Sequence, residues 1–117
     1  MRAWLVAGAA LALWPAAAHA AALAPNEIQA TFFNGQPFTA STPSNVKFKM
    51  VFTPDGKMTR APLAKVGARS EGTWKLSKDG FCTTWKGSSE RCFKLMSAGS
   101  NKWSVMQGST AIATWTK

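Results

Sequence analysis

Carboxylates are the main reactive groups of this 117-residue chain, because its only histidine, His19, lies in an N-terminal segment that we expect to be removed. The five acidic residues are Glu27, Asp55, Glu71, Asp79 and Glu90. Two carboxylates can share the acid and base roles, as in glycosidases, whereas Ser/His/Asp and Cys/His mechanisms need a histidine. Four of the five acids adjoin predicted turns or a helix start, where turn and capping roles explain them. We therefore predict that the protein is not an enzyme.

Two cysteines, Cys82 and Cys92, are the other reactive side chains. An even number of cysteines in a small exported domain indicates a disulfide. The nine intervening residues do not form the CxxC arrangement of redox-active thiols, and two cysteines without a histidine leave a zinc site half built. Phosphate-loop, dinucleotide-binding and calcium-binding motifs are also missing from the sequence. We predict a structural disulfide, no metal and no cofactor.

The first twenty residues have the features of a cleavable signal peptide. Arg2 supplies a positive charge, residues 3–14 are apolar, and Ala18 and Ala20 form the small-x-small pattern that signal peptidase accepts. The apolar run is too short to span a bilayer, and no comparable run follows it. We expect cleavage near Ala20, which leaves residues 21–117 as one domain, periplasmic or secreted, with no transmembrane segment in the mature chain.

The remaining sequence predicts a mainly β domain with one short N-terminal helix over residues 25–33. Pro25 suits the first turn of that helix, and Ile28 and Phe32 fall on one of its faces. Residues 36–45 contain two prolines and several Ser and Thr, and so predict a loop or an irregular extended segment. Alternating polar and apolar residues predict strands over residues 46–53, 57–61, 71–77, 81–86, 91–97, 102–107 and 110–116.

Short strands at this even spacing favour an antiparallel β-meander, which either closes into a small barrel or forms a two-layer sheet. The phase of the side chains predicts its inner surface. The apolar residues of one phase are Phe48, Met50, Trp74, Leu76, Phe81, Trp85, Phe93, Leu95, Trp103 and Val105. In the last strand Ile112 and Trp115 fall in opposite phases, so we expect Trp115 to be an exposed aromatic residue.

Lysines occupy the opposite, outward phase, at Lys47, Lys49, Lys75, Lys86, Lys94 and Lys102. Without Arg2 the domain has thirteen Lys and Arg against five acids, a formal charge of +8. Such a charge attracts anions. We therefore predict that the six lysines bind an anionic envelope component, namely lipopolysaccharide, phospholipid headgroups or a glycan. Export makes nucleic acid an unlikely partner.

A motif of three parts resembles a known family. Residues 72–76 read GTWKL, residues 82–85 read CTTW, and Cys92 follows. This GTW…CxxW…C core is similar to that of small exported proteobacterial proteins grouped as a domain of unknown function. The resemblance covers about residues 25–117. It implies a shared fold and an exported location, and it assigns no catalytic residue.

The sequence thus leads to an exported, non-enzymatic binding or envelope-associated protein whose lysines engage an anionic surface or ligand. Two other functions stay open. One is a secreted inhibitor or effector that binds a protein partner through the loops at residues 36–45 and 62–70. The other is a carrier of a small hydrophobic ligand, held in a cavity lined by tryptophans.

Overall fold

The computed structural model describes residues 21–64 and 67–117 of the chain. The predicted signal peptide lies outside the described residues. The elements, in chain order, are helix α2 (Pro25–Phe32) and strands β1 (Phe38–Ser41), β2 (Lys47–Phe52), β3 (Lys57–Pro62), β4 (Ser70–Leu76), β5 (Phe81–Trp85), β6 (Arg91–Gly99), β7 (Lys102–Gln107) and β8 (Thr110–Thr116). None of the described helices is long and apolar enough to cross a membrane.

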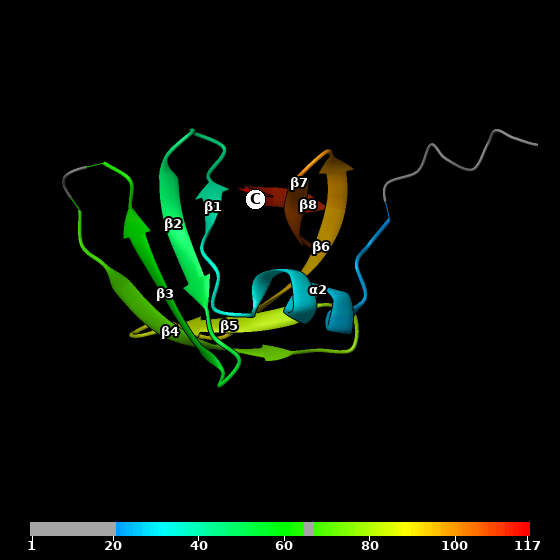
Figure 1. Ribbon diagram of the computed structural model, residues 1–117, viewed down its shortest axis with the longest axis horizontal. Helices are drawn as coiled ribbons and strands as arrows, with labels where there is room; N and C mark the ends of the chain where they lie inside the picture. Colours follow the sequence, from blue (N-terminus) through cyan, green and yellow to red (C-terminus); the bar gives the residue numbers. More distant parts are fainter. Residues whose placement is uncertain (1–20, 65–66) are drawn as a thin grey trace, which may run out of the picture.

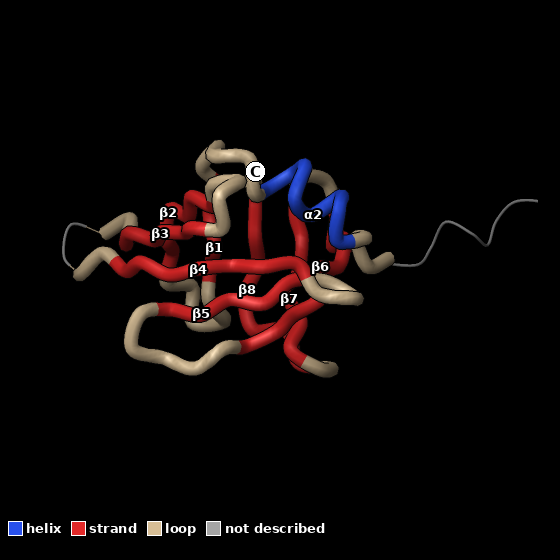
Figure 2. Tube along the Cα trace, turned by 90° about the horizontal axis from the view of Figure 1, so that it is seen from below, coloured by secondary structure: helices blue, strands red, loops and turns tan. Residues whose placement is uncertain are grey.

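The eight strands form a closed barrel in which every strand pairs antiparallel with its neighbours in the chain. Pairing of β1 with β8 closes it, with Ala40 opposite Trp115. The predicted mainly β meander with one short helix is therefore confirmed. Of the two predicted forms, a barrel and a two-layer sheet, the protein adopts the barrel. Figure 1 shows the strands in sequence colours, and Figure 2 shows them from below.

Strand β1 lies inside the predicted loop or irregular segment at residues 36–45, so that prediction was wrong for four residues. Its two inward residues, Phe38 and Ala40, are buried, and its two outward residues are half-buried. The neighbouring prolines, Pro37 and Pro43, lie just outside the strand, where they remove no hydrogen bond from its ladders. The strand forms because two partners, β2 and β8, bond to its two edges.

Helix α2 covers one end of the barrel. Its first turn is capped by Glu27, whose carboxylate accepts a hydrogen bond of 2.8 Å from the Ala24 N–H. The Phe32 ring packs edge-on against Trp103 and Trp115. Phe33 stacks on Phe52 at a centroid distance of 4.6 Å. Both phenylalanines are fully buried, so the helix fills this end of the barrel with aromatic side chains.

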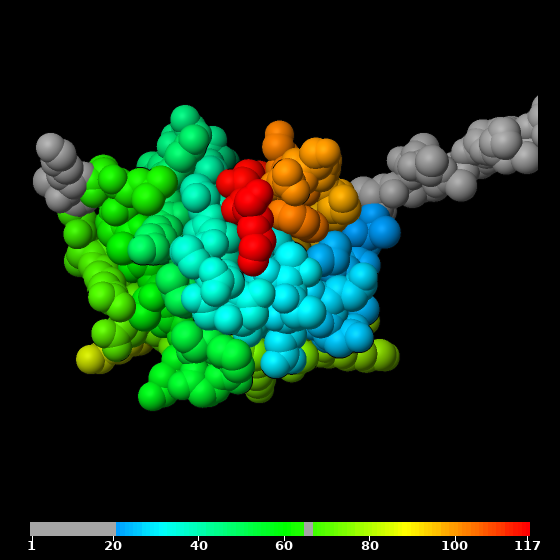
Figure 3. Space-filling model, in the orientation of Figure 1, coloured from blue at the N-terminus to red at the C-terminus, as the bar shows by residue number. Residues whose placement is uncertain are grey.

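The C-terminal residue ties the last strand to this helix. The Lys117 ammonium donates a hydrogen bond to the Thr31 carbonyl and lies 5.5 Å from the centre of the Phe32 ring. Figure 3 shows the red C-terminal segment lying against the cyan surface that contains the helix. The helix is thus held from the inside by its aromatic residues and from the outside by the chain end.

Trp115 is buried, with 4% of its surface exposed, so the prediction of an exposed aromatic residue was wrong. The register between β7 and β8 explains the error. Val105 pairs with Ala113 and Met106 with Ala111, which leaves Ile112 as an extra residue in a β-bulge. A bulge reverses the alternation of side chains beyond it. Trp115 therefore points inward although simple alternation from Ile112 places it outside.

Candidate functional site: the open end of the barrel

A pocket of about 160 Å³ lies inside the barrel, at the end away from α2. Its floor consists of Phe52, Phe81 and Trp115, which also contact Phe33 of the helix segment. The helix and the pocket therefore lie on opposite sides of one aromatic layer. Strand β2 runs from the pocket end of the barrel to the helix end. Phe48, near its beginning, lines the pocket, and its last residue, Phe52, lies against the helix segment.

The mouth of the pocket combines aromatic rings with one positive charge. Phe48, Trp85, Phe93 and Ile112 are half-buried and line the pocket together with Arg60. The Arg60 guanidinium carbon lies 4.4 Å from the centre of the Trp85 ring and 5.2 Å from that of Phe48. Both distances are within the range of cation–π attraction. The two rings thus hold the guanidinium at the entrance of an otherwise apolar pocket.

Arg60 has no negative partner in the described structure. All five acids lie within it, and none brings a carboxylate oxygen within 4.0 Å of this guanidinium. Its Nε atom is buried and makes no hydrogen bond to any described residue. Glu71 lines a shallow depression beside Arg60 but forms no ion pair with it. A buried N–H without a partner costs free energy, which an acceptor that reaches this atom would recover.

Further positive charges surround the mouth. Arg60 and Arg91 line one depression that adjoins the pocket, and Arg60 lines a second with Arg69 and Lys86. Glu71 is the one acidic residue in these two linings. The electrostatic potential at the open end is therefore positive, and anions that approach it are attracted.

Arg60 was not among the binding residues expected from the sequence, although the alternation of β3 places it inside the barrel. Met58 and Arg60 are two residues apart on β3, and Met58 is buried. Since alternate residues of a strand share a face, Arg60 points into the barrel like Met58. What alternation did not predict is that Arg60 lies between Trp85 and Phe48, because these rings come from β5 and β2.

The six lysines of the predicted anionic-ligand site all lie outside the barrel and are exposed: Lys47, Lys49, Lys75, Lys86, Lys94 and Lys102. Closure of the barrel separates them. Strand β2 carries the first two and β6 carries Lys94, and these strands are four places apart in a ring of eight. The lysines therefore face several directions and do not form one surface. Their role in binding stays a prediction.

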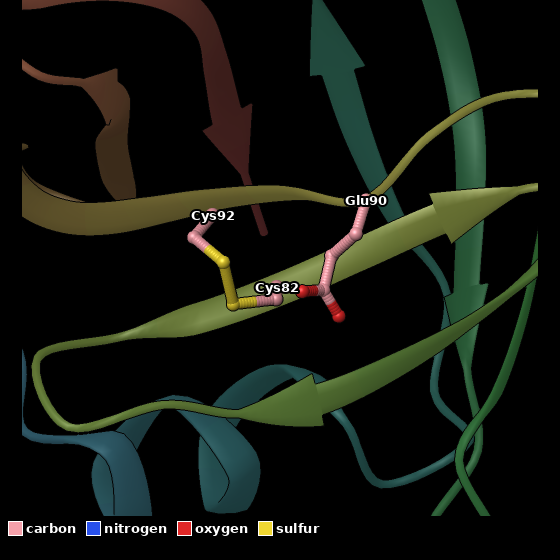
Figure 4. A group of neighbouring side chains, drawn as sticks. All are labelled: Cys82, Glu90 and Cys92. Atoms are coloured by element: carbon pink, nitrogen blue, oxygen red, sulfur yellow. A yellow bond between two sulfur atoms is a disulfide. The ribbon is translucent and has the colours of Figure 1, made fainter.

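The predicted disulfide between Cys82 and Cys92 is present. The two residues are direct partners in the register of β5 and β6. Cys82 is buried although it belongs to an outward phase. Lys75, its partner on β4, forms an ion pair of 3.1 Å with Glu90, and Figure 4 shows the Glu90 carboxylate beside the disulfide. This ion pair covers the bridge on the outside of the barrel.

Cys82, Glu90 and Cys92 are also the only group of three potential metal-ligating residues within residues 21–64 and 67–117. Both sulfur atoms are engaged in the disulfide. A disulfide offers no thiolate, the form of cysteine that binds metals. In the oxidised protein this group therefore supplies one carboxylate, and we assign it a structural role.

The carboxylate of Asp55 has a structural role in the turn between β2 and β3. It accepts hydrogen bonds from the Thr53 hydroxyl and, at 3.3 Å, from the Lys57 N–H. These bonds, that of Thr53 foremost, lower the pKa of Asp55 below its ordinary value. Together with the helix cap at Glu27 and the ion pair of Glu90, three of the five acids thus have identified structural partners.

These features define a class: a small, closed, eight-stranded β-barrel with a helix over one end and an aromatic pocket with an inward-facing arginine at the other. Comparisons with protein-family models, curated proteins and solved structures found no match. The resemblance to the exported family with a GTW…CxxW…C core therefore stays a prediction. Function has to be argued from the site itself.

Proposed function

We propose that the protein is an exported, non-enzymatic binding protein that holds a small, mainly apolar molecule in the open end of its barrel. The pocket is the observation that carries this proposal. A hollow of about 160 Å³ between aromatic side chains is a feature that close packing ordinarily removes. Of the functions that the sequence left open, the small-ligand carrier is the one that this geometry supports best.

The size of the pocket limits the ligand. An apolar protein cavity of about 150 Å³ holds one benzene molecule, so a ligand body of about one six-membered ring fits within 160 Å³. Drug-sized ligands occupy pockets of roughly 300–1,000 Å³. We therefore propose a ligand with a single ring or a short branched chain, and not a lipid with long acyl chains.

Binding at this pocket can be blocked without touching the helix end. Ala113 lines the pocket, and Ala111 is exposed two residues earlier on the same strand. We expect the protein to bind benzyl alcohol, and Ala113→Met, which fills the cavity, to weaken that binding at least tenfold. Ala111→Met is the matched control and should leave the affinity unchanged. Titration followed by methyl NMR signals of Ile112 in the pocket and Leu63, which is 54% exposed, locates the ligand.

The result that contradicts the proposal is also visible in this titration. If neither benzyl alcohol nor toluene shifts the Ile112 methyl signals at millimolar concentration, the pocket does not bind small apolar molecules. Equal shifts at Ile112 and Leu63 indicate non-specific association, and they contradict the proposal as well.

The exported location is part of the proposal. Its support is the disulfide, since such bonds persist in oxidising compartments such as the periplasm or the cell exterior. The signal-peptide pattern in residues 1–20 agrees with that location.

A second candidate function is contact of the outer lysines with an anionic envelope surface such as lipopolysaccharide or phospholipid. The observation that favours it is the exposure of all six lysine side chains. Because the barrel directs them to different sides, we expect only one group to touch a flat surface. Charge reversal of Lys47 and Lys49 to glutamate, compared with Lys94→Glu on the far side, should then reduce vesicle binding unequally, by about tenfold for one group at 50 mM salt.

Sedimentation with vesicles that contain anionic phospholipid measures this difference. Equal losses for the two groups indicate general attraction by net charge, and no loss indicates that the lysines serve solubility. Either outcome removes the second candidate.

A further inference from the structure

We propose that the ligand of the barrel pocket carries a carboxylate, and that Arg60 binds this group at the mouth while the apolar part of the ligand enters the barrel. This inference rests on the proposed function and specifies the chemical class of the ligand. The specificity-determining residue is then Arg60, which the sequence analysis did not single out.

The positive charge of Arg60 has no opposite charge beside it among the described residues. A charge that leaves water is stabilised by a partner of opposite sign. Among the described residues no carboxylate pairs with Arg60, and its buried Nε has no hydrogen-bond acceptor. The guanidinium carbon lies within cation–π distance of the Trp85 and Phe48 rings. A negative partner for this side chain has to come from outside the described residues.

The shape of the guanidinium favours a carboxylate as its partner. A guanidinium presents parallel N–H groups that match the two oxygens of one carboxylate. Since Arg60 lines both the apolar pocket and the polar depression that contains Arg91, a ligand bound to it has two environments within reach. A single-ring body fits the aromatic side, and a carboxylate fits the positive side. A neutral ligand offers the guanidinium no opposite charge.

Positive side chains also surround the path by which a ligand reaches Arg60. The entrance carries Arg69, Lys86 and Arg91 around Arg60, with Glu71 as the one acid. Positive potential at a concave site raises the local concentration of anions and the rate at which they bind. Cationic ligands are repelled by the same residues. The rim thus selects for the sign of the ligand's charge before Arg60 contacts it.

The test compares benzoate with benzamide, its neutral analogue of almost equal size, at pH 7 and about 150 mM salt. We expect benzoate to bind the oxidised, disulfide-bonded protein at least tenfold more tightly, and to shift the Nε–H NMR signal of Arg60. Arg60→Met keeps a long apolar side chain between the two rings and should reduce benzoate affinity at least tenfold, to that of benzamide. Lys57→Met removes one charge from the same strand, outside the mouth, and should preserve the preference.

Three outcomes overturn the inference, and they separate it from the proposed function. Equal affinity of the unaltered protein for benzoate and benzamide refutes carboxylate recognition and leaves the small-ligand pocket standing. A preference for benzoate that survives Arg60→Met, or falls equally in Lys57→Met, assigns it to general charge and not to Arg60. Absence of binding by both compounds overturns this inference and the proposed function together. The comparison of ligands on the unaltered protein needs no variant, so a folding defect in Arg60→Met does not affect it.

Discussion

Replacing Trp115 with alanine is expected to lower the free energy of unfolding by about 3–5 kcal/mol, the range for truncation of a large buried aromatic residue. Its ring contacts those of five phenylalanines at centroid distances from 4.6 to 6.3 Å: Phe32, Phe33, Phe38, Phe52 and Phe81. These phenylalanines come from the helix segment and from three strands, so truncation of Trp115 removes contacts to all four of these segments. Urea unfolding followed by circular dichroism measures it.

Leu63→Ala is the control for Trp115→Ala. Leu63 is a large apolar residue that is 54% exposed, and truncation at such a site changes stability by about 0.5 kcal/mol or less. Trp115→Phe is the second comparison and should recover part of the loss, because a smaller ring leaves a smaller cavity. A loss below about 1 kcal/mol in Trp115→Ala contradicts the central position that the fold assigns to this residue.

Loss of the disulfide is expected to have the second large effect. Cys82 and Cys92 are ten residues apart in the sequence, and the chain-entropy model gives a loop of this size about 2.5–3 kcal/mol. We expect the double variant Cys82→Ala/Cys92→Ala to lose about 3 kcal/mol of unfolding free energy. For a domain of this size that corresponds to a fall in Tm of roughly 12–24 °C. Thermal unfolding of the variant, with the unaltered protein measured with and without reductant, checks this.

The ion pair over the disulfide supplies the control for that experiment. Lys75 and Glu90 are largely solvent-exposed, and an exposed ion pair contributes about 0–1 kcal/mol. Lys75→Met should therefore change Tm by only a few degrees. If the double cysteine variant and Lys75→Met unfold at the same temperature, the bridge does not constrain the unfolded chain as the entropic account requires.

The two effects have different origins and different consequences for the pocket. Trp115 belongs to the pocket floor, so its truncation enlarges the cavity as well as weakening the core. The disulfide lies on the outward face of β5 and β6, and neither cysteine side chain lines the pocket. We therefore expect the double cysteine variant, where folded, to retain the pocket, and the Trp115 variant to alter the ligand size that it accepts.

Most of the secondary structure could be predicted from the sequence because its signals are local. Alternation of lysines with apolar residues placed β2, and turn residues separated the later strands. Pro25 and the spacing of Ile28 and Phe32 placed the helix. The disulfide also followed from local facts, since both cysteines lie in the same phase of two strands joined by one turn.

The sequence by itself therefore determined the helix, seven of the eight strands, the apolar inside and the disulfide of this domain. Only the tertiary structure decided the rest. Strand β1 exists because β2 and β8 offer it two edges, and the bulge at Ile112 turns Trp115 into the core. Closure of the barrel separates the lysines and brings Trp85 and Phe48 to Arg60. Each of these depends on pairing between segments distant in the chain, and periodicity within one segment carries no information about its partners.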